Sequence, residues 1–148
     1  MAEKDRISKT LESYNSVFAD IVNALLFDGK QIVLPDELSP AEIDSQYKAD
    51  GKIHSQERDV SKYWRNTNIM IYFGLENQSD TDEFMPVRVI SYDGAAYRNQ
   101  YKLRKRSDKE KLSPVITLVL YFGENDWKYE KKPAFVSGYP AGIAALCQ

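Results

Sequence analysis

A tight β-hairpin is the feature that most constrains how this chain can fold. Residues 60–64 and 69–75 are rich in aromatic and β-branched side chains, and the Asn-Thr-Asn sequence at 66–68 is typical of a turn. If the turn is centred between residues 67 and 68, residues whose numbers sum to about 135 lie opposite each other in an antiparallel ladder. The hairpin therefore predicts that Asp59 faces Glu76 across the two strands.

The predicted register brings oxygen ligands together on one face of the hairpin. Opposed side chains share a face, with Cβ atoms roughly 5 Å apart, and Gln78 shares the face of Glu76 because side chains alternate along a strand. Two carboxylates this close repel unless a proton or a cation lies between them. Oxygen ligands without His or Cys favour Mg²⁺, or Mn²⁺, and such an ion suits phosphodiester hydrolysis. The alternative is that Asp59 and Glu76 are two ordinary acids on an exposed sheet face.

The segments before the hairpin predict helix and loop. Apolar residues recur at three- and four-residue spacing over residues 8–28, which predicts one leading helix. Ser39-Pro40 followed by Glu42 resembles a helix start, so a short helix or turn is expected over residues 40–47. The polar residues 48–57 are expected to form a loop.

The segments after the hairpin complete an α/β (α+β) pattern. A helix is expected from Met85 onward, which Asp93-Gly94 could bend or interrupt, and a solvated loop is expected over residues 103–111. The nearly unbroken apolar run at 114–122 predicts a strand covered on both faces, as in a parallel or mixed central sheet. The order of elements predicts a central mixed β-sheet flanked by helices.

Composition restricts the class of protein. The chain has 148 residues, 43% of them hydrophobic and 28% charged, which suits a globular domain with a substantial core. No apolar run approaches the roughly 20 residues that cross a bilayer, and Cys147 is the single cysteine, so a cytoplasmic protein without disulfides is expected. A net charge of −2 argues mildly against a non-specific DNA-coating protein but not against an enzyme with a basic face.

Four ordered segments resemble the recombination-promoting nuclease and putative transposase family of the PD-(D/E)XK superfamily. They are residues 58–60, 74–78, 85–93 and 114–123, and residues 18–26 resemble the leading helix of that family. The resemblance covers roughly residues 10–127. It implies a restriction-endonuclease-like core over residues 1–132, followed by an atypical tail at 133–148 that does not resemble what normally follows in the family.

The resemblance also implies roles for individual residues. Asp59 matches the acid of the first motif and Glu76 that of the second, which makes both metal ligands; Gln78 stands where the superfamily usually has lysine. A neutral amide there can position water or phosphate but lacks the positive charge of lysine. Arg88 and Tyr92 match the helix after the second motif and are candidates for phosphate contact, with a surface arginine beside a packed tyrosine as the alternative.

Further candidates lie outside these motifs. Asp20 on the leading helix could be an auxiliary acid, although an acid on an amphipathic helix is usually solvated. A basic cluster could contact the DNA backbone or form a solvated surface; it includes Lys102, Arg104, Lys105 and Arg106.

The sequence thus predicts a Mg²⁺-dependent DNA endonuclease of transposase or recombination-promoting type, with DNA as partner and a homodimer as one assembly that could make double-strand breaks. The alternative is an inactive or truncated nuclease fold that acts as a binding module.

Overall fold

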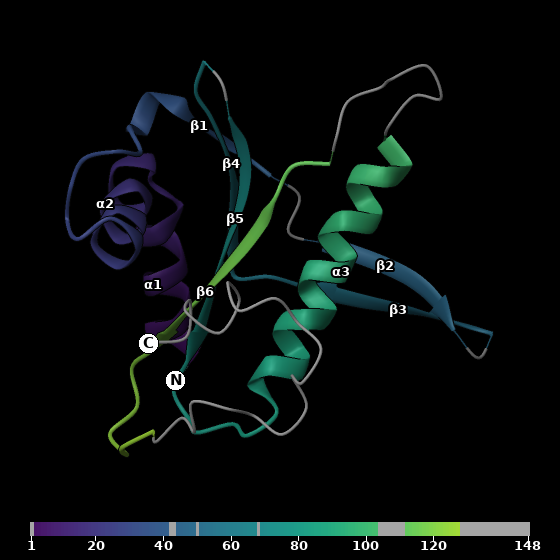
Figure 1. Cartoon of the computed structure of the whole chain (residues 1–148). Helices are drawn as coiled ribbons and strands as arrows, with labels where there is room; N and C mark the ends of the chain where they lie inside the picture. The colour runs from purple at the N-terminus through teal and green to yellow at the C-terminus, as the bar shows by residue number, and fades with distance from the viewer. Residues whose placement is uncertain (1, 42–43, 50, 68, 104–111, 128–148) are drawn as a thin grey trace, which may run out of the picture.

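The structure, a computed structural model, describes residues 2–41, 44–49, 51–67, 69–103 and 112–127 (Figure 1). Its helices are α1 (Ala2–Ser13), α2 (Asn15–Leu26) and α3 (Met85–Leu103), with a short 3-10 helix η1 (Pro35–Glu37). Its strands are β1 (Leu38–Pro40), β2 (Asp44–Ala49), β3 (Lys52–Glu57), β4 (Val60–Arg65), β5 (Met70–Gln78) and β6 (Val115–Tyr121).

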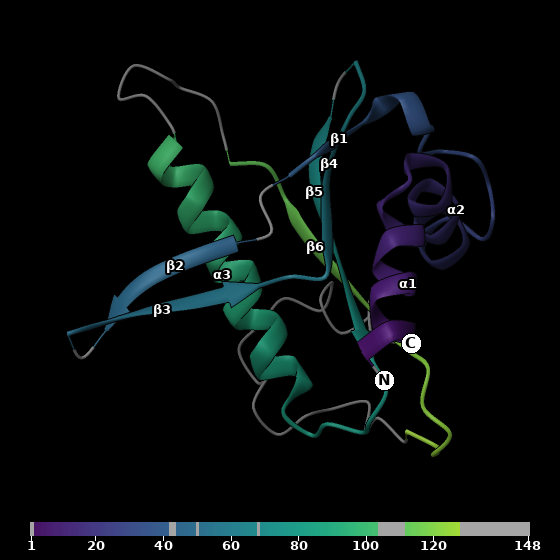
Figure 2. The same cartoon turned by 180° about the vertical axis from the view of Figure 1, so that it is seen from behind.

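A four-stranded mixed sheet forms the middle layer. Its strand order is β1-β4-β5-β6, with antiparallel pairing up to β5 and parallel pairing between β5 and β6. Helices α1 and α2 cover one face, and α3 connects β5 to β6 across the other face (Figures 1 and 2). This arrangement confirms the predicted fold class, a restriction-endonuclease-like α/β core with a central mixed sheet flanked by helices.

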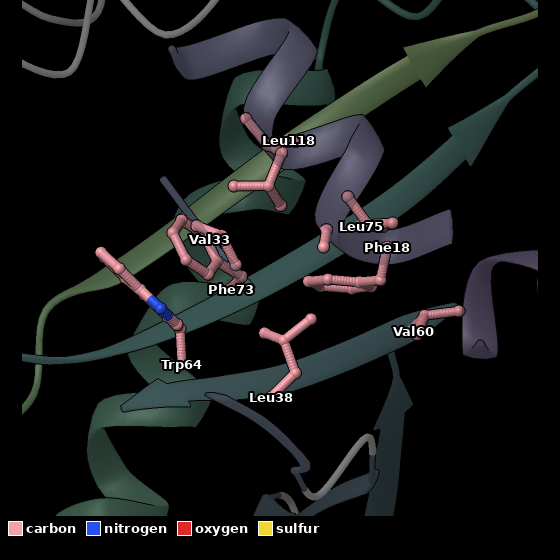
Figure 3. Packing of buried hydrophobic residues seen from close by; sticks show 10 residues of the cluster. Phe18, Val33, Leu38, Val60, Trp64, Phe73, Leu75 and Leu118 are labelled. Carbon is pink, nitrogen blue, oxygen red and sulfur yellow. The ribbon is translucent and has the colours of Figure 1, made fainter. Parts of the chain in front are cut away.

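The main core lies between the sheet and the α1–α2 layer. Phe73 and Leu75 of β5 point into it from alternate positions and meet Phe18 and Val22 of α2, all four fully buried. Figure 3 shows Phe18 above the sheet, with Leu118 of β6 on the same side. Because side chains alternate along β5, the positions between these core residues, including 74 and 76, face the opposite layer.

The hairpin register is the one that the sequence predicts. Val60 pairs with Leu75 and Arg65 with Met70, so opposed residue numbers sum as expected. The turn is closed by Asn66, whose backbone N–H donates to the Ile69 carbonyl and whose side-chain oxygen accepts from the Ile69 N–H.

The single leading helix predicted over residues 8–28 is wrong, because the chain folds into two helices. The break falls at Tyr14, which has an extended backbone (φ −70°, ψ 130°). Ser13 donates its hydroxyl to the Thr10 carbonyl, and Asn15 donates its amide to the carbonyls of Pro35 and Leu38. Ser13 ends α1 and Asn15 begins α2, and the hydrogen bonds of their side chains to backbone carbonyls stabilise the break between the two helices.

The helix and loop predicted over residues 40–57 are also wrong. Instead, β2 and β3 form an antiparallel hairpin that crosses α3 and extends beyond it (Figures 1 and 2). Its strands carry polar residues at most positions, so neither the apolar alternation nor the β-branched content that marks an ordinary strand is present in the sequence.

Helix α3 and strand β6 follow the sequence more closely. The predicted helix at Met85 runs without interruption through Asp93-Gly94 to Leu103. Strand β6 lies at the edge of the described sheet, with Leu118 buried in the core and Thr117 buried towards α3. None of the helices in the described part of the chain combines the length and apolar character that a bilayer crossing requires.

Candidate active site

Asp59 and Glu76 lie at the end of the β4–β5 ladder. Glu76 is in β5 and only 3% exposed, and Asp59 directly precedes β4, one step beyond the last ladder pair. The Asp59 carboxylate accepts a hydrogen bond from the backbone N–H of Asn77 (2.7 Å) and forms an ion pair with Lys9 of α1 (2.8 Å). The hairpin therefore holds the first acid rigidly beside the strand that carries the second.

The surroundings of Glu76 disfavour its negative charge. Burial, followed by the charge of Asp59, raises the pKa of Glu76 to about 7, although Arg58, Arg88 and Lys9 act in the opposite direction. Its Oε1 atom is buried and has no hydrogen-bond partner among the described residues. A proton or a cation at this carboxylate would relieve both the repulsion and the unsatisfied acceptor.

Gln78 and Arg88 form the polar side of the site next to Glu76. Arg88 of α3 donates to the Gln78 side-chain oxygen (3.2 Å) and to Asp82 (3.3 Å). Hydrogen bonding to Tyr92, and to Asp82, raises the pKa of Arg88. The fold thus brings the residues predicted from the sequence to the end of β5 and the facing part of α3. They are Asp59, Glu76, Gln78, Arg88 and Tyr92.

A buried arginine directly before Asp59 was not predicted as a site residue from the sequence. Arg58, 3% exposed, donates to the Thr117 hydroxyl and to the Asp93 carboxylate (2.8 Å), and Thr117 donates to the same carboxylate (2.6 Å). Its guanidinium also lies over the rings of Tyr72 and Tyr92, 5.4 and 5.3 Å from their centroids. The one sequence indication was a charged residue directly beside Asp59.

Gly74 makes room for this arginine. It is the β5 residue that faces α3 between Tyr72 and Glu76, and a Cβ atom built there would collide with the Arg58 guanidinium. The network ties the segment before β4 to α3 and β6, so it holds the start of β4, and with it Asp59, in place.

Helix α1 contributes two residues that were not expected. Lys9 pairs with Asp59, and Glu12, which is buried, accepts a hydrogen bond from the Asn77 side-chain amide (2.8 Å). Asp20, the expected auxiliary acid, is exposed on α2, opposite the buried Phe18. The acidic residue of the leading helices that contacts the end of β5 is therefore Glu12 of α1 and not Asp20 of α2.

Of the predicted basic cluster, the structure describes Lys102. Lys102 is exposed in the last turn of α3, about 21 Å along the helix axis from Arg88. Arg104, Lys105 and Arg106 lie outside the described residues.

The carboxylate oxygens of Asp59 and Glu76 suit a hard divalent cation for which the protein supplies only some of the ligands. No group of three or more His, Cys, Asp or Glu side chains in the described ranges is close enough to hold a metal ion. Two carboxylates, one with an unsatisfied buried oxygen, match the way Mg²⁺ is commonly bound, by one or two acids with waters and substrate phosphate completing the shell.

Comparison with known proteins finds a matching family. Residues 59–134, about half of the chain, match the family described as putative transposase, YhgA-like, and the match begins at Asp59 and includes Glu76, Gln78, Arg88 and Tyr92. Neither a curated protein nor a solved structure matches the chain. The chain therefore belongs to the YhgA-like putative transposase family, a family of PD-(D/E)XK type.

Proposed function

We propose that this protein is a Mg²⁺-dependent DNA endonuclease of transposase or recombination-promoting type. The observation that carries the proposal is the buried Glu76 carboxylate, which has an unpartnered oxygen and a second acid, Asp59, close enough to raise its pKa. A bound cation would offset the repulsion between the two acids and give the buried Glu76 oxygen a partner. Mn²⁺ is expected to replace Mg²⁺, since both prefer oxygen ligands.

In this proposal Asp59 and Glu76 hold the cation. When bound, the cation supplies Lewis-acid polarisation of the phosphate and lowers the pKa of an attacking water. Arg88 neutralises part of the charge that develops on the phosphate oxygens, and Tyr92 keeps its side chain oriented. Gln78, already held by Arg88, positions the water or the phosphate through its amide.

DNA is the substrate that the family assignment favours. Lys102 and the basic residues at 104–106 would contact the phosphate backbone beyond the cleavage site, which would make binding depend on salt concentration. Arg88 donates to the side chain of Gln78, two residues beyond Glu76, so it is suited to contact a phosphate held at the acid pair, with Lys102 further along the same helix.

Cleavage of supercoiled plasmid with Mg²⁺ or Mn²⁺ tests the proposal. Asp59→Asn and Glu76→Gln should each reduce nicking about a hundredfold or more, because each removes a charged ligand. Asp36→Asn is a matched control: Asp36 is exposed in η1, two residues before Leu38, which pairs with Trp64 towards the far end of β4. Nicking that persists in both site variants would refute the assignment.

A second candidate is a nuclease fold that binds DNA or protein without cutting. The observation in its favour is the Lys9–Asp59 ion pair, which already compensates one acid of the pair without a metal. A thermal shift titration separates the two candidates. A two-carboxylate metal site raises the melting temperature with Mn²⁺ concentration by ligand linkage, whereas a non-catalytic sheet end does not respond.

A further inference from the structure

Helix α3 carries a second apolar stripe on the side that does not face the sheet. Val87, Ile90 and Tyr101 are exposed, with Val87 at 52% and Tyr101 at 69%. Tyr97, 37% exposed, borders the stripe, because its hydroxyl accepts a hydrogen bond from the backbone N–H of Val115 in β6. Together with Gly94 they follow the alternating three- and four-residue spacing that joins two helices in a coiled coil. The buried residues of α3, Met85, Ala95 and Ala96, lie on its other side, which faces the sheet. We call the exposed stripe the α3 seam.

Gly94 at the centre of the seam has no role within the described monomer. Nothing in the described part of the chain lies within 4 Å of a Cβ atom built at this position. A glycine in a helix interior costs about 1 kcal/mol relative to alanine, so its presence calls for a close approach of another backbone. The seam is therefore built to receive a second helix that crosses near Gly94.

The partner that fits is the α3 seam of a second copy. The seam is nearly symmetric about Gly94, because Val87 lies seven residues before it and Tyr101 seven residues after it. An antiparallel pair would set Val87 of one copy near Tyr101 of the other, which is the self-complementary contact that a two-fold axis requires.

Charge favours the antiparallel arrangement of the two seams. The acids Asp80, Asp82 and Glu83 precede α3, whereas Lys102 ends it and the sequence continues with basic residues at 104–106. In an antiparallel pair the acidic end of one helix lies beside the basic end of the other. A parallel pair would place like charges together at both ends.

We infer that two copies of the chain associate through antiparallel α3 seams about a two-fold axis at Gly94. The association does not depend on the proposed nuclease activity, because the seam is on the side of α3 away from Gly74 and Glu76. It would relate two Asp59–Glu76 sites by a two-fold axis.

Sedimentation of the full chain over a range of concentrations tests this inference. The wild-type chain should form a dimer, and Val87→Glu and Tyr101→Glu should each weaken it at least about tenfold, because a glutamate in the seam would lose its hydration. Leu25→Glu is the matched control, since Leu25 is 51% exposed on α2, outside the seam. Circular dichroism and urea unfolding verify that each variant folds.

A charge exchange tests the orientation. Glu83→Lys should weaken the dimer, and the double variant Glu83→Lys with Lys102→Glu should restore it, because only antiparallel helices bring residue 83 of one copy near residue 102 of the other.

Three outcomes would overturn the inference. They are a monomer at every concentration, a dimer that resists both seam variants, and a monomer whose stability falls with Val87→Glu, which would mean that a segment of the same chain covers the seam.

Discussion

Replacing Glu76 with glutamine should change how the stability of the protein depends on pH. The Glu76 side chain is almost completely buried, and burial together with the charge of Asp59 raises its pKa from 4.5 to about 7. The folded protein therefore holds a proton on Glu76 that the unfolded chain releases between these two pH values. Glutamine has nearly the shape of the protonated acid but cannot ionise.

The sign and size of the effect follow from proton linkage. Because the folded state binds the proton more tightly, the free energy of unfolding of the wild type falls as pH rises from about 4.5 to about 7, and this contribution is constant at higher pH. A pKa change of this size corresponds to about 3 kcal/mol between the two protonation states. Glu76→Gln should therefore match the wild type near pH 4 and exceed its stability by up to about 3 kcal/mol at pH 8, in the absence of divalent metal.

Urea unfolding monitored by tryptophan fluorescence at several pH values between 4 and 8 measures this difference, with EDTA present to remove divalent ions. Asp36→Asn provides the same acid-to-amide change at an exposed position and should follow the wild-type pH profile. If Glu76→Gln also follows the wild-type profile, the buried-acid reasoning for Glu76 is wrong.

Three other predictions concern the same end of the sheet. Gly74→Ala should destabilise the fold by about 2–4 kcal/mol in urea unfolding, because the new Cβ collides with the buried Arg58; an unchanged midpoint would mean that the arginine network can move freely. Lys9→Met should tighten Mn²⁺ binding several-fold in calorimetry, since it removes a positive charge 2.8 Å from Asp59; weaker binding would instead assign Lys9 a supporting role. Below pH 7 the affinity for Mn²⁺ should fall about tenfold per pH unit, because the metal must displace the proton from Glu76, and a pH-independent affinity would exclude Glu76 as a ligand.

Local patterns in the sequence determined the hairpin and, through it, the acid pair. Alternating side chains set the face of each residue in β5, and the Asn-rich turn set the register, so the opposition of Asp59 and Glu76 followed from arithmetic on neighbouring residues. Helix α3 was predictable for a similar reason, since its apolar spacing lies within one continuous segment. The apolar run at 114–122 and the order of elements indicated the mixed sheet, and the ordered family motifs agreed with that order.

Only the tertiary structure decided what surrounds the acids. Lys9 and Glu12 reach the end of β5 because the chain breaks at Tyr14 and packs α1 separately against the sheet, a contact between residues 65 positions apart in the case of Glu12 and Asn77. Arg58 is buried because Asp93 and Thr117, from two other elements, satisfy its guanidinium and Gly74 leaves it space. These contacts join segments that are far apart in the sequence, so no local pattern of side chains predicts them. Burying a charged side chain is unfavourable unless its hydrogen-bonding and ionic partners are all in place, and only the tertiary structure brings those partners together.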